Sequence, residues 1–296
     1  MNTTTQKSYR LVKRIKSDKF NIDDLHHYTL CLLVGIRDFQ MCIIDSRSNT
    51  LLLLEDFRLE GVKTVNSRIN ALRSIFDNHH LLKAGFWKSV KLALKTHKFT
   101  LVPSSHFVSS SAIDYLVVTS EIKAEVEEVF HYKHTSSEAV NVFAGDRRLV
   151  KWVRSLYPNK NVTIIHQGSA FIEGLLKHDD HPHNRTMFCF FDKGILHTVV
   201  TEKQKLLYYN QFAIKTIDDY LKYILLVFKE LRLQQKTTKL IMWGHLNQSS
   251  QQVTMLRKYI RNISFGERPA TLKFSYHFDE IADHQFFDLL NIHLCD

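Results

Sequence analysis

Apolar residues form three short runs between residues 29 and 57, separated by polar breaks rich in Gly, Asp, Ser and Asn. Short apolar runs bounded by such breaks are typical of β-strands joined by tight turns, so the pattern predicts a three-stranded meander. A similar pattern recurs over residues 187–212, about 155 positions later. Each copy is followed by a segment with helical periodicity, such as residues 66–76. Two meanders, each followed by a helix, predict two duplicated lobes.

Residues 88–95 alternate between apolar and other side chains. Val90, Leu92 and Leu94 fall on one face of the predicted strand, and Lys91 and Lys95 fall on the other. Such alternation is typical of a strand with one face exposed to water. Charge reversal at the two lysines is therefore expected to weaken partner binding without unfolding the protein, since exposed charges contribute little to stability.

The middle of the chain predicts a strand at 139–143, a helix that begins after Asp146, a strand at 162–165 and a helix capped by Ser169. This order implies two parallel strands with a right-handed crossover. In the second half, Thr216 precedes a helix over residues 217–233. It is apolar around so much of its circumference that it should be almost wholly buried. The remaining predicted elements are a strand at 239–243, a helix at 253–260, a strand at 272–278 and a helix at 284–294.

The composition is that of a globular protein, with 44% hydrophobic residues in 296 and only 9 Gly and 4 Pro. No apolar stretch approaches the roughly 18 residues that a membrane span needs, so no transmembrane segment is expected. The first 20 residues carry cations without the apolar core of a secretory signal. A cytoplasmic location is the expectation.

The formal charge of +10 is concentrated in two segments. Residues 1–20 hold six Lys and Arg against one acid, and residues 83–98 hold five Lys and no acid. These segments are either solvated surfaces or docking sites for an acidic protein partner, nucleic acid or anionic lipid.

The four cysteines lack the spacing of a metal site. Cys31 and Cys42 should face one another across the first hairpin, as small core residues and not as a disulfide. The run His178-Asp179-Asp180-His181-Pro182-His183 has groups that could chelate zinc, but no regular spacing. It is interpreted as a solvated linker, and no metal site is predicted.

Two motifs that could support chemistry have simpler structural explanations, and one class of enzyme lacks its carboxylates. Residues 104–106 bring serines next to a histidine, but adjacency in sequence does not supply the geometry of a nucleophile and its base. The segment Gln167-Gly168-Ser169 could bind an anion at a helix N-terminus, although helix capping also accounts for it. Residues 30–34 contain no carboxylate, which argues against a ribonuclease-H-like nuclease with two metal ions.

A meander, a helix, a further strand and a further helix, present twice, resemble the plan of the actin-like ATPase fold. The chain is similar to a bacterial domain-of-unknown-function family, number 3822, through its first meander, VNVFAGD at residues 140–146 and FFDLLNIHLC at residues 286–295. The resemblance implies an α/β protein with two duplicated ribonuclease-H-like lobes, each a mixed β-sheet flanked by helices, around a nucleotide cleft. The implied division is 1–25 for a basic N-terminal segment, 26–178 for the first lobe, 179–185 for a linker and 186–296 for the second lobe.

Nucleotide-binding members of this fold carry glycine-containing turns for phosphate, metal and adenosine. In the first hairpin this chain keeps Gly35, but Val34 replaces the acid, and Ile36 and Arg37 replace small hydroxyl residues. β-Branched side chains obstruct the close approach of phosphate to backbone amides.

The second hairpin keeps Asp192 and Gly194 around Lys193, but Ile195 replaces the second glycine. The adenosine turn keeps a single glycine before a histidine. All three turns are expected to reach one cleft, with Ile36 and Ile195 in the space that a phosphate would need. The candidate cleft-lining residues are Gly35, Arg37, Asp192, Lys193, Gly194, Gly244 and His245.

The damaged turns favour a non-catalytic protein-interaction scaffold with a degenerate nucleotide-binding site. This hypothesis has no catalytic residues, no cofactor and an unidentified protein partner. The alternative is a divergent ATPase or small-molecule kinase that uses ATP and Mg²⁺. For the lobes themselves, each meander should lie beside a parallel strand: 140–143 or 162–165 in the first lobe and 239–243 in the second.

Overall fold

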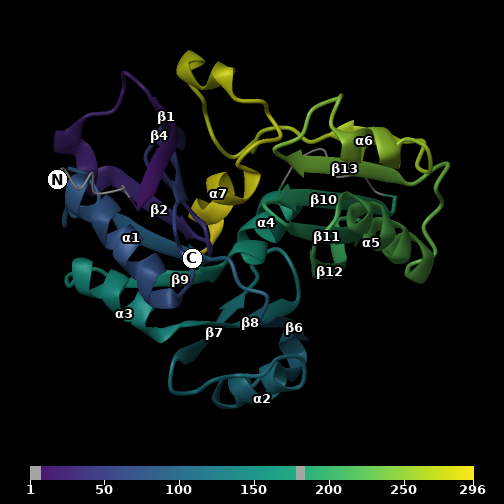
Figure 1. The fold of residues 1–296 in the computed structure, drawn as a ribbon, viewed down its shortest axis with the longest axis horizontal. Coiled ribbons are helices and arrows are strands. Elements are labelled where there is room, and N and C mark those ends of the chain that lie inside the picture. The colour runs from purple at the N-terminus through teal and green to yellow at the C-terminus, as the bar shows by residue number, and fades with distance from the viewer. Residues whose placement is uncertain (1–7, 178–183) are drawn as a thin grey trace, which may run out of the picture.

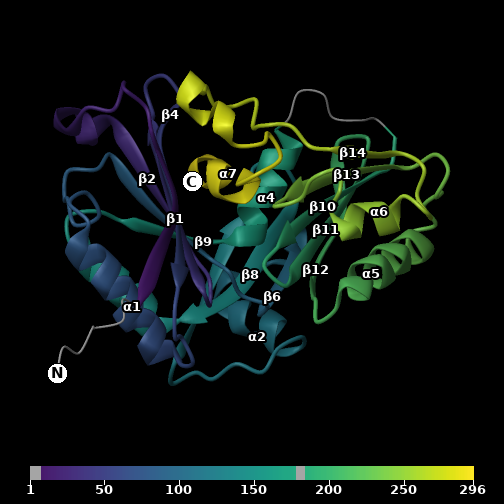
Figure 2. The same ribbon diagram turned by 45° about the horizontal axis from the view of Figure 1, so that its top comes forward.

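The computed structural model describes residues 8–177 and 184–296. Two lobes lie side by side: purple and blue strands build the first, and green strands build the second (Figures 1 and 2). Each lobe is organised around one mixed β-sheet, and a third, three-stranded sheet completes the molecule. The predicted run 178–183 lies outside the described residues.

The two large sheets have the same plan. Their strand orders are β1-β4-β3-β2-β5-β9 and β12-β11-β10-β13-β14, so the second repeats the first from β4 to β9. The meander strands are antiparallel in both lobes, and both predicted meanders are confirmed. They are β2 (Tyr28–Val34), β3 (Asp38–Asp45), β4 (Thr50–Leu59), β10 (Thr186–Asp192), β11 (Ile195–Glu202) and β12 (Lys205–Ala213).

One parallel strand lies beside each meander. In the second lobe it is β13 (Lys239–Gly244), as predicted, with β14 (Ile263–Phe265) outside it. In the first lobe it is β5 (Ser89–Leu94), with β9 (Val162–His166) outside it. The prediction that 140–143 or 162–165 lies directly beside the first meander is therefore wrong.

The third sheet explains that error. It contains β6 (Phe99–Pro103), β8 (Ala139–Asp146) and β7 (Glu127–Lys133), with β8 antiparallel to both neighbours. The predicted parallel pairing of 139–143 with 162–165 is therefore wrong. The chain leaves β8 through α3 (Arg147–Leu156), which Asp146 caps by accepting hydrogen bonds from the first helical amides, as predicted. It then returns to the first sheet as β9.

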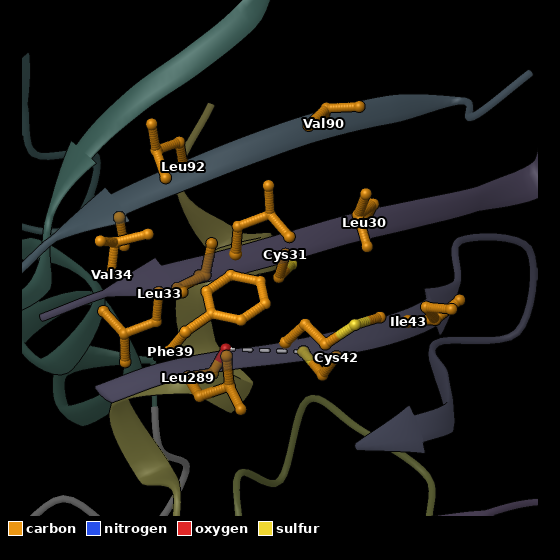
Figure 3. Packing of buried hydrophobic residues seen from close by; sticks show 14 of the residues in the cluster. Leu30, Cys31, Leu33, Val34, Phe39, Cys42, Ile43, Val90, Leu92 and Leu289 are labelled. Carbon is orange, nitrogen blue, oxygen red and sulfur yellow. Dashed lines mark hydrogen bonds between the residues drawn. The ribbon is translucent and has the colours of Figure 1, made fainter. Parts of the chain in front are cut away.

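The central strands of the first lobe are buried on both faces. On one face of β3, the Phe39 ring packs against Phe76 of α1 (Val65–Asn78). Cys42, three positions later and hence on the other face, lies with its Sγ 3.8 Å from the carbonyl oxygen of Leu289 (Figure 3). Cys31 pairs with Cys42 across the hairpin, as predicted, and both thiols are free and buried.

A helix with a capping box follows each meander, α1 in the first lobe and α5 (Ile217–Glu230) in the second. The prediction that the second of these helices is almost wholly buried is wrong. Only one side of α5 faces its sheet, so Ile224 and Phe228 are buried while Leu226 is 43% exposed. The apolar circumference exceeds the face that the sheet can cover.

Two helices lie between the lobes (Figures 1 and 2). One is α4 (Gln167–Leu176), which follows β9 and is N-capped by His166 and not by Ser169. The other is α7 (Phe287–Asn291), which packs against α4 and also contacts β2 and β3. The predicted C-terminal helix is shorter because Phe286 has a left-handed backbone, with φ of 58°.

The predicted strand at 272–278 is also wrong. The segment makes one isolated bridge, from Lys273 to Thr50, and then turns into η4 (Tyr276–Glu280).

The strand β1 (Tyr9–Lys16) forms the edge of the first sheet, so these basic residues are paired with β4. No helix among the described residues is long and apolar enough to cross a bilayer. The remaining elements are η1 (Ile22–His27), η2 (Ser104–His106), η3 (Ser109–Ser111), α2 (Ala112–Val117), α6 (Gln251–Leu256) and η5 (Ile292–Leu294).

The predicted exposure of Lys91 and Lys95 is wrong. Because β5 lies inside the sheet, Lys91 is only 4% exposed. Its Nζ donates to the carbonyl oxygens of His293, at 2.8 Å, and Cys295, at 2.6 Å. Charge reversal there would put a carboxylate against carbonyl oxygens, so it would destabilise the fold. The basic segment 83–98 is not one continuous solvated surface.

Candidate functional site

A cleft with a volume of about 720 Å³ receives residues from both lobes. The β2–β3 turn contributes Ile36 and Arg37, and the β10–β11 turn contributes Lys193 and Gly194. His245 enters after β13. The predicted approach of three turns to one cleft is confirmed, whereas ligand binding by these residues stays a prediction.

The two glycines that do not line the cleft are buried beneath it, and each allows a close approach within the protein. A Cβ on Gly35 would lie 2.1 Å from Asp38 Oδ1. Gly244 has a φ of +120°, and a Cβ there would lie 2.3 Å from the carbonyl oxygen of Phe191. Glycine is needed at both positions to make room for protein atoms. The sequence predicts turns with glycine at these two positions, and the structure has them. The glycines make room for protein atoms, however, and not for phosphate.

Lys95, directly after β5, occupies the floor of the cleft. Its Nζ lies 2.6 Å from Asp38 Oδ2 and 2.8 Å from Asp192 Oδ2, and its side chain is 5% exposed. Burial disfavours the ammonium, but the carboxylates of Asp192 and Asp38 outweigh burial and raise the pKa of Lys95 well above its usual range. A charged lysine thus joins one carboxylate from each lobe.

Both carboxylate oxygens of Asp192 are engaged by protein donors. Oδ1 accepts a hydrogen bond from the backbone amide of Lys193 at 2.9 Å. Oδ2 accepts one from Gln167 Nε2 at 2.8 Å and also faces the Lys95 ammonium. Burial alone would raise the pKa of Asp192, but Lys95 and Gln167 hold it well below its usual range. Asp192 is therefore a fixed anion inside the protein.

Gln167 extends this network to the helices between the lobes. The same Nε2 donates to Asp288 Oδ2 of α7 at 2.7 Å, so one amide joins Asp192 to Asp288. Burial raises the pKa of Asp288 to about 6. The segment from Gln167 to Ser169 is a weak anion-site candidate, but the Gly168 amide at this helix N-terminus already donates to His166 Nδ1 at 3.1 Å.

The sequence analysis missed the roles of Lys95, Asp38, Gln167 and Asp288. Lys95 had one available signal: it directly follows a mostly apolar strand. The partners of Gln167 lie 25 and 121 positions away, so local spacing gives no sign of them.

Histidine-based metal chemistry gains no support from the part of the chain that the structure describes. There, ligand atoms of Asp24, His26 and His27 lie within 4.8 Å of one another in η1, where His26 is exposed and the other two are partly buried. Such surface groups are common without an ion, and no metal role follows.

Comparison with sequence families identifies the chain. A family described as "Protein of unknown function (DUF3822)" matches residues 17–263. The chain belongs to the DUF3822 family. Curated proteins give no match to its sequence.

Solved structures show that this DUF3822 protein has the actin-like ATPase fold. It is 18% identical to a protein with this fold and unknown function from Bacteroides thetaiotaomicron VPI-5482, with a TM-score of 0.79 over 94% of this chain and 99% of that one. A chain of the PilM–PilN type IV pilus biogenesis complex is 12% identical, with a TM-score of 0.56 over 90% of this chain and 97% of that one. Ethanolamine utilization protein EutJ from Carboxydothermus hydrogenoformans is 10% identical, with a TM-score of 0.51 over 95% of this chain and 93% of that one. At these identities the likeness establishes the fold alone.

The titration of Asp288 gives a first prediction for this DUF3822 chain. Asp288→Asn should raise the free energy of unfolding at neutral pH by up to about 3 kcal/mol, since a pKa raised by about two costs that much to ionise in the folded state. Between an unfolded pKa of 3.8 and a folded pKa of about 6, the folded protein binds more protons, so wild-type stability falls as pH rises.

Urea unfolding near pH 4 and near pH 7 measures this effect. The gain from Asp288→Asn should be larger near pH 7, and Asp114→Asn, at an exposed aspartate, should give none at either pH. A stability difference from wild type that does not change with pH would contradict the assignment.

Proposed function

We propose that this protein is a non-catalytic actin-like scaffold, whose cleft is closed to nucleotide by its own ion pairs and which acts by binding another protein. The observation that carries the proposal is the Lys95 ammonium, held between Asp38 and Asp192 at the junction of the lobes. It puts a fixed protein cation beside the carboxylate that the family resemblance associates with metal binding.

Metal binding at this position would require free carboxylate oxygens. Mg²⁺ prefers near-ideal octahedral oxygen coordination and usually keeps several waters. Both oxygens of Asp192 already accept hydrogen bonds, and Lys95 supplies the neutralising charge. A magnesium ion would have to displace a buried, paired ammonium, which the Coulomb attraction of two close carboxylates opposes.

Phosphate binding meets a second obstacle. Ile36 and Ile195 line the cleft beside the two turns that would hold phosphate. The Lys193 amide, a donor that a phosphate could otherwise use, is bonded to Asp192. Apolar side chains and an occupied amide both argue against a phosphate cradle.

Two observations support a protein partner. Chains of this fold take part in the PilM–PilN complex, which is an assembly of two proteins by its description. In addition, α2 and its flanks expose Val108, Ile113, Val117 and Val118, which are between 41% and 83% exposed. Apolar side chains gathered at the surface are typical of protein contacts.

A divergent ATPase or small-molecule kinase is the second candidate, and the volume of the cleft favours it. A space of about 720 Å³ lies in the size range of small-molecule sites. This candidate requires Lys95 to move away from Asp192 when ATP and Mg²⁺ bind.

Titration calorimetry with ATP and Mg²⁺ decides between the two, together with an assay of released phosphate. We expect no heat of binding and no phosphate above the buffer background. Micromolar binding that depends on Mg²⁺ would overturn the scaffold proposal, and measurable phosphate release would establish the enzyme.

A further inference from the structure

Three arginines line the mouth of the cleft, and two of them have no side-chain partner among the described residues. Arg10 and Arg58 are directly paired across β1 and β4, and both line the cleft with Arg37. Within the described residues, Arg37 and Arg58 make no side-chain hydrogen bond or ion pair, and Arg10 reaches only Glu60, at 3.7 Å. Like charges directly opposite on neighbouring strands destabilise a sheet, so this arrangement favours a bound anion.

The acids of the cleft are engaged deeper in the site. Asp38 lies directly opposite Arg58 across β3 and β4, but its carboxylate faces Lys95. Asp38 and Asp192 face Lys95. Asp56 accepts from Gln40 at 3.1 Å and lies 3.5 Å from Lys193 Nζ. The floor is thus internally paired, and the unbalanced charge at the mouth is positive.

The two cleft histidines do not add to this charge. Desolvation lowers the pKa of His97 and of His245, which disfavours their charged forms. Lys193, the other exposed cation of the cleft, already lies near Asp38 and Asp56, so the arginines supply the unbalanced positive charge.

Apolar side chains accompany the arginines. Val12 is 51% exposed and Ile36 is 61% exposed, and both line the same cleft with Ile195. A phosphate ligand gains nothing from such neighbours. A peptide with acidic and apolar side chains complements both, because guanidinium groups bind carboxylates in a bidentate geometry and valine or isoleucine covers apolar surface.

We propose that Arg10, Arg37 and Arg58 form a binding site for an acidic peptide segment of a partner protein at the mouth of the cleft. This inference rests on the proposed scaffold function and names the chemistry of its partner.

Fluorescence anisotropy tests the site with a labelled peptide that alternates Glu and Val, and with the same peptide carrying Gln for Glu. The Glu peptide should bind wild type with an affinity that falls as salt rises, and the Gln peptide should not bind. Arg37→Gln with Arg58→Gln should weaken binding at least about tenfold, since each lost charge-assisted contact contributes that much.

Arg261→Gln is the matched control, because this arginine is exposed, makes no ion pair within residues 8–177 and 184–296, and lies outside the cleft lining. It should bind the Glu peptide like wild type. The double cleft variant should melt no lower than wild type, since it removes the repulsion between Arg10 and Arg58; this keeps a loss of binding separate from a loss of fold.

Three results would overturn the inference: no binding of the Glu peptide, equal binding of the Gln peptide, or undiminished binding by the double cleft variant. Inorganic triphosphate is a third probe. If it displaces the labelled Glu peptide at a lower concentration than the unlabelled Glu peptide does, the site would be assigned to phosphate instead. The scaffold proposal fails by a different result, which is Mg²⁺-dependent binding of ATP. If neither ATP nor the Glu peptide binds, only the peptide site is overturned.

Discussion

Lys95→Ala is expected to lower the free energy of unfolding by about 3–5 kcal/mol, because it leaves two buried carboxylates without their cation. The side chains of Asp38 and Asp192 are 6% and 8% exposed, so water cannot replace the ammonium effectively. The two carboxylates come from different lobes, and their mutual repulsion should also loosen the junction between the lobes. Urea unfolding at neutral pH measures the loss.

Lys193→Ala is the matched control for this experiment. That lysine also faces Asp38, at 3.6 Å, but its side chain is 44% exposed, so its removal should cost less than about 1 kcal/mol. Magnesium ions should partly restore the stability of Lys95→Ala, since they can bind the freed carboxylates of the folded protein, and should leave wild type unchanged. Equal losses for the two lysine variants would show that Lys95 does not hold the cleft closed.

The meanders could be predicted because their sequence signal is local. Strands buried on both faces appear as continuous apolar runs, and the turns between them require Gly, Asn or Asp at particular positions. Both conditions are met in residues 29–57. In residues 187–212 they are met by β10, β11 and the turn with Asp192 and Gly194. By contrast, β12 is only partly buried, and Lys203 and Gln204 form its turn with positive φ. The repeat then gives the duplication, which the matching strand orders of the two sheets confirm.

The strand beside the first meander could not be assigned because its lysines imitate a solvent-facing pattern. In β5, Lys91 lies between the apolar residues Val90 and Leu92, and Lys95 directly follows the strand. The groups that pair with these cations in the folded protein lie far from them in the sequence. Lys95 pairs with Asp38, 57 positions earlier, and Lys91 bonds to carbonyl oxygens more than 200 positions later. Burial of a lysine depends on such distant partners, and the periodicity of apolar residues along a strand does not reveal them.

The cleft shows the same division between local and distant information. Its turns were found, since a glycine-containing hairpin is a short-range signal. The link from Gln167 to Asp192 and Asp288 was not found, because it depends on how α4 and α7 lie between the lobes. The helix lengths also differed from prediction there: the left-handed backbone at Phe286 delays the start of α7.

Glu173→Gln is expected to lower the free energy of unfolding by about 3 kcal/mol at neutral pH, since one pKa unit corresponds to about 1.4 kcal/mol. Glu173 of α4 is fully buried and holds the β7–β8 turn against the helix. Its Oε1 lies 3.0 Å from His134 Nδ1 and accepts from the Thr135 amide at 2.9 Å, while Oε2 accepts from the Thr135 and Ser136 hydroxyls. Burial alone would raise the pKa of Glu173, but His134 and Thr135 lower it to about 2.

The sign of the pH dependence separates charge from packing in this variant. A folded pKa of about 2 against 4.5 in the unfolded chain means that the contribution of Glu173 is complete above pH 4.5 and is lost as pH falls toward 2. The stability difference between wild type and Glu173→Gln, followed by urea unfolding, should therefore shrink over that range. Glu202→Gln, at an exposed ion pair with Arg185, should show little difference at any pH. A difference for Glu173→Gln that stayed constant down to about pH 2 would assign the loss to the changed hydrogen bonding of the amide and not to the charge of the buried carboxylate.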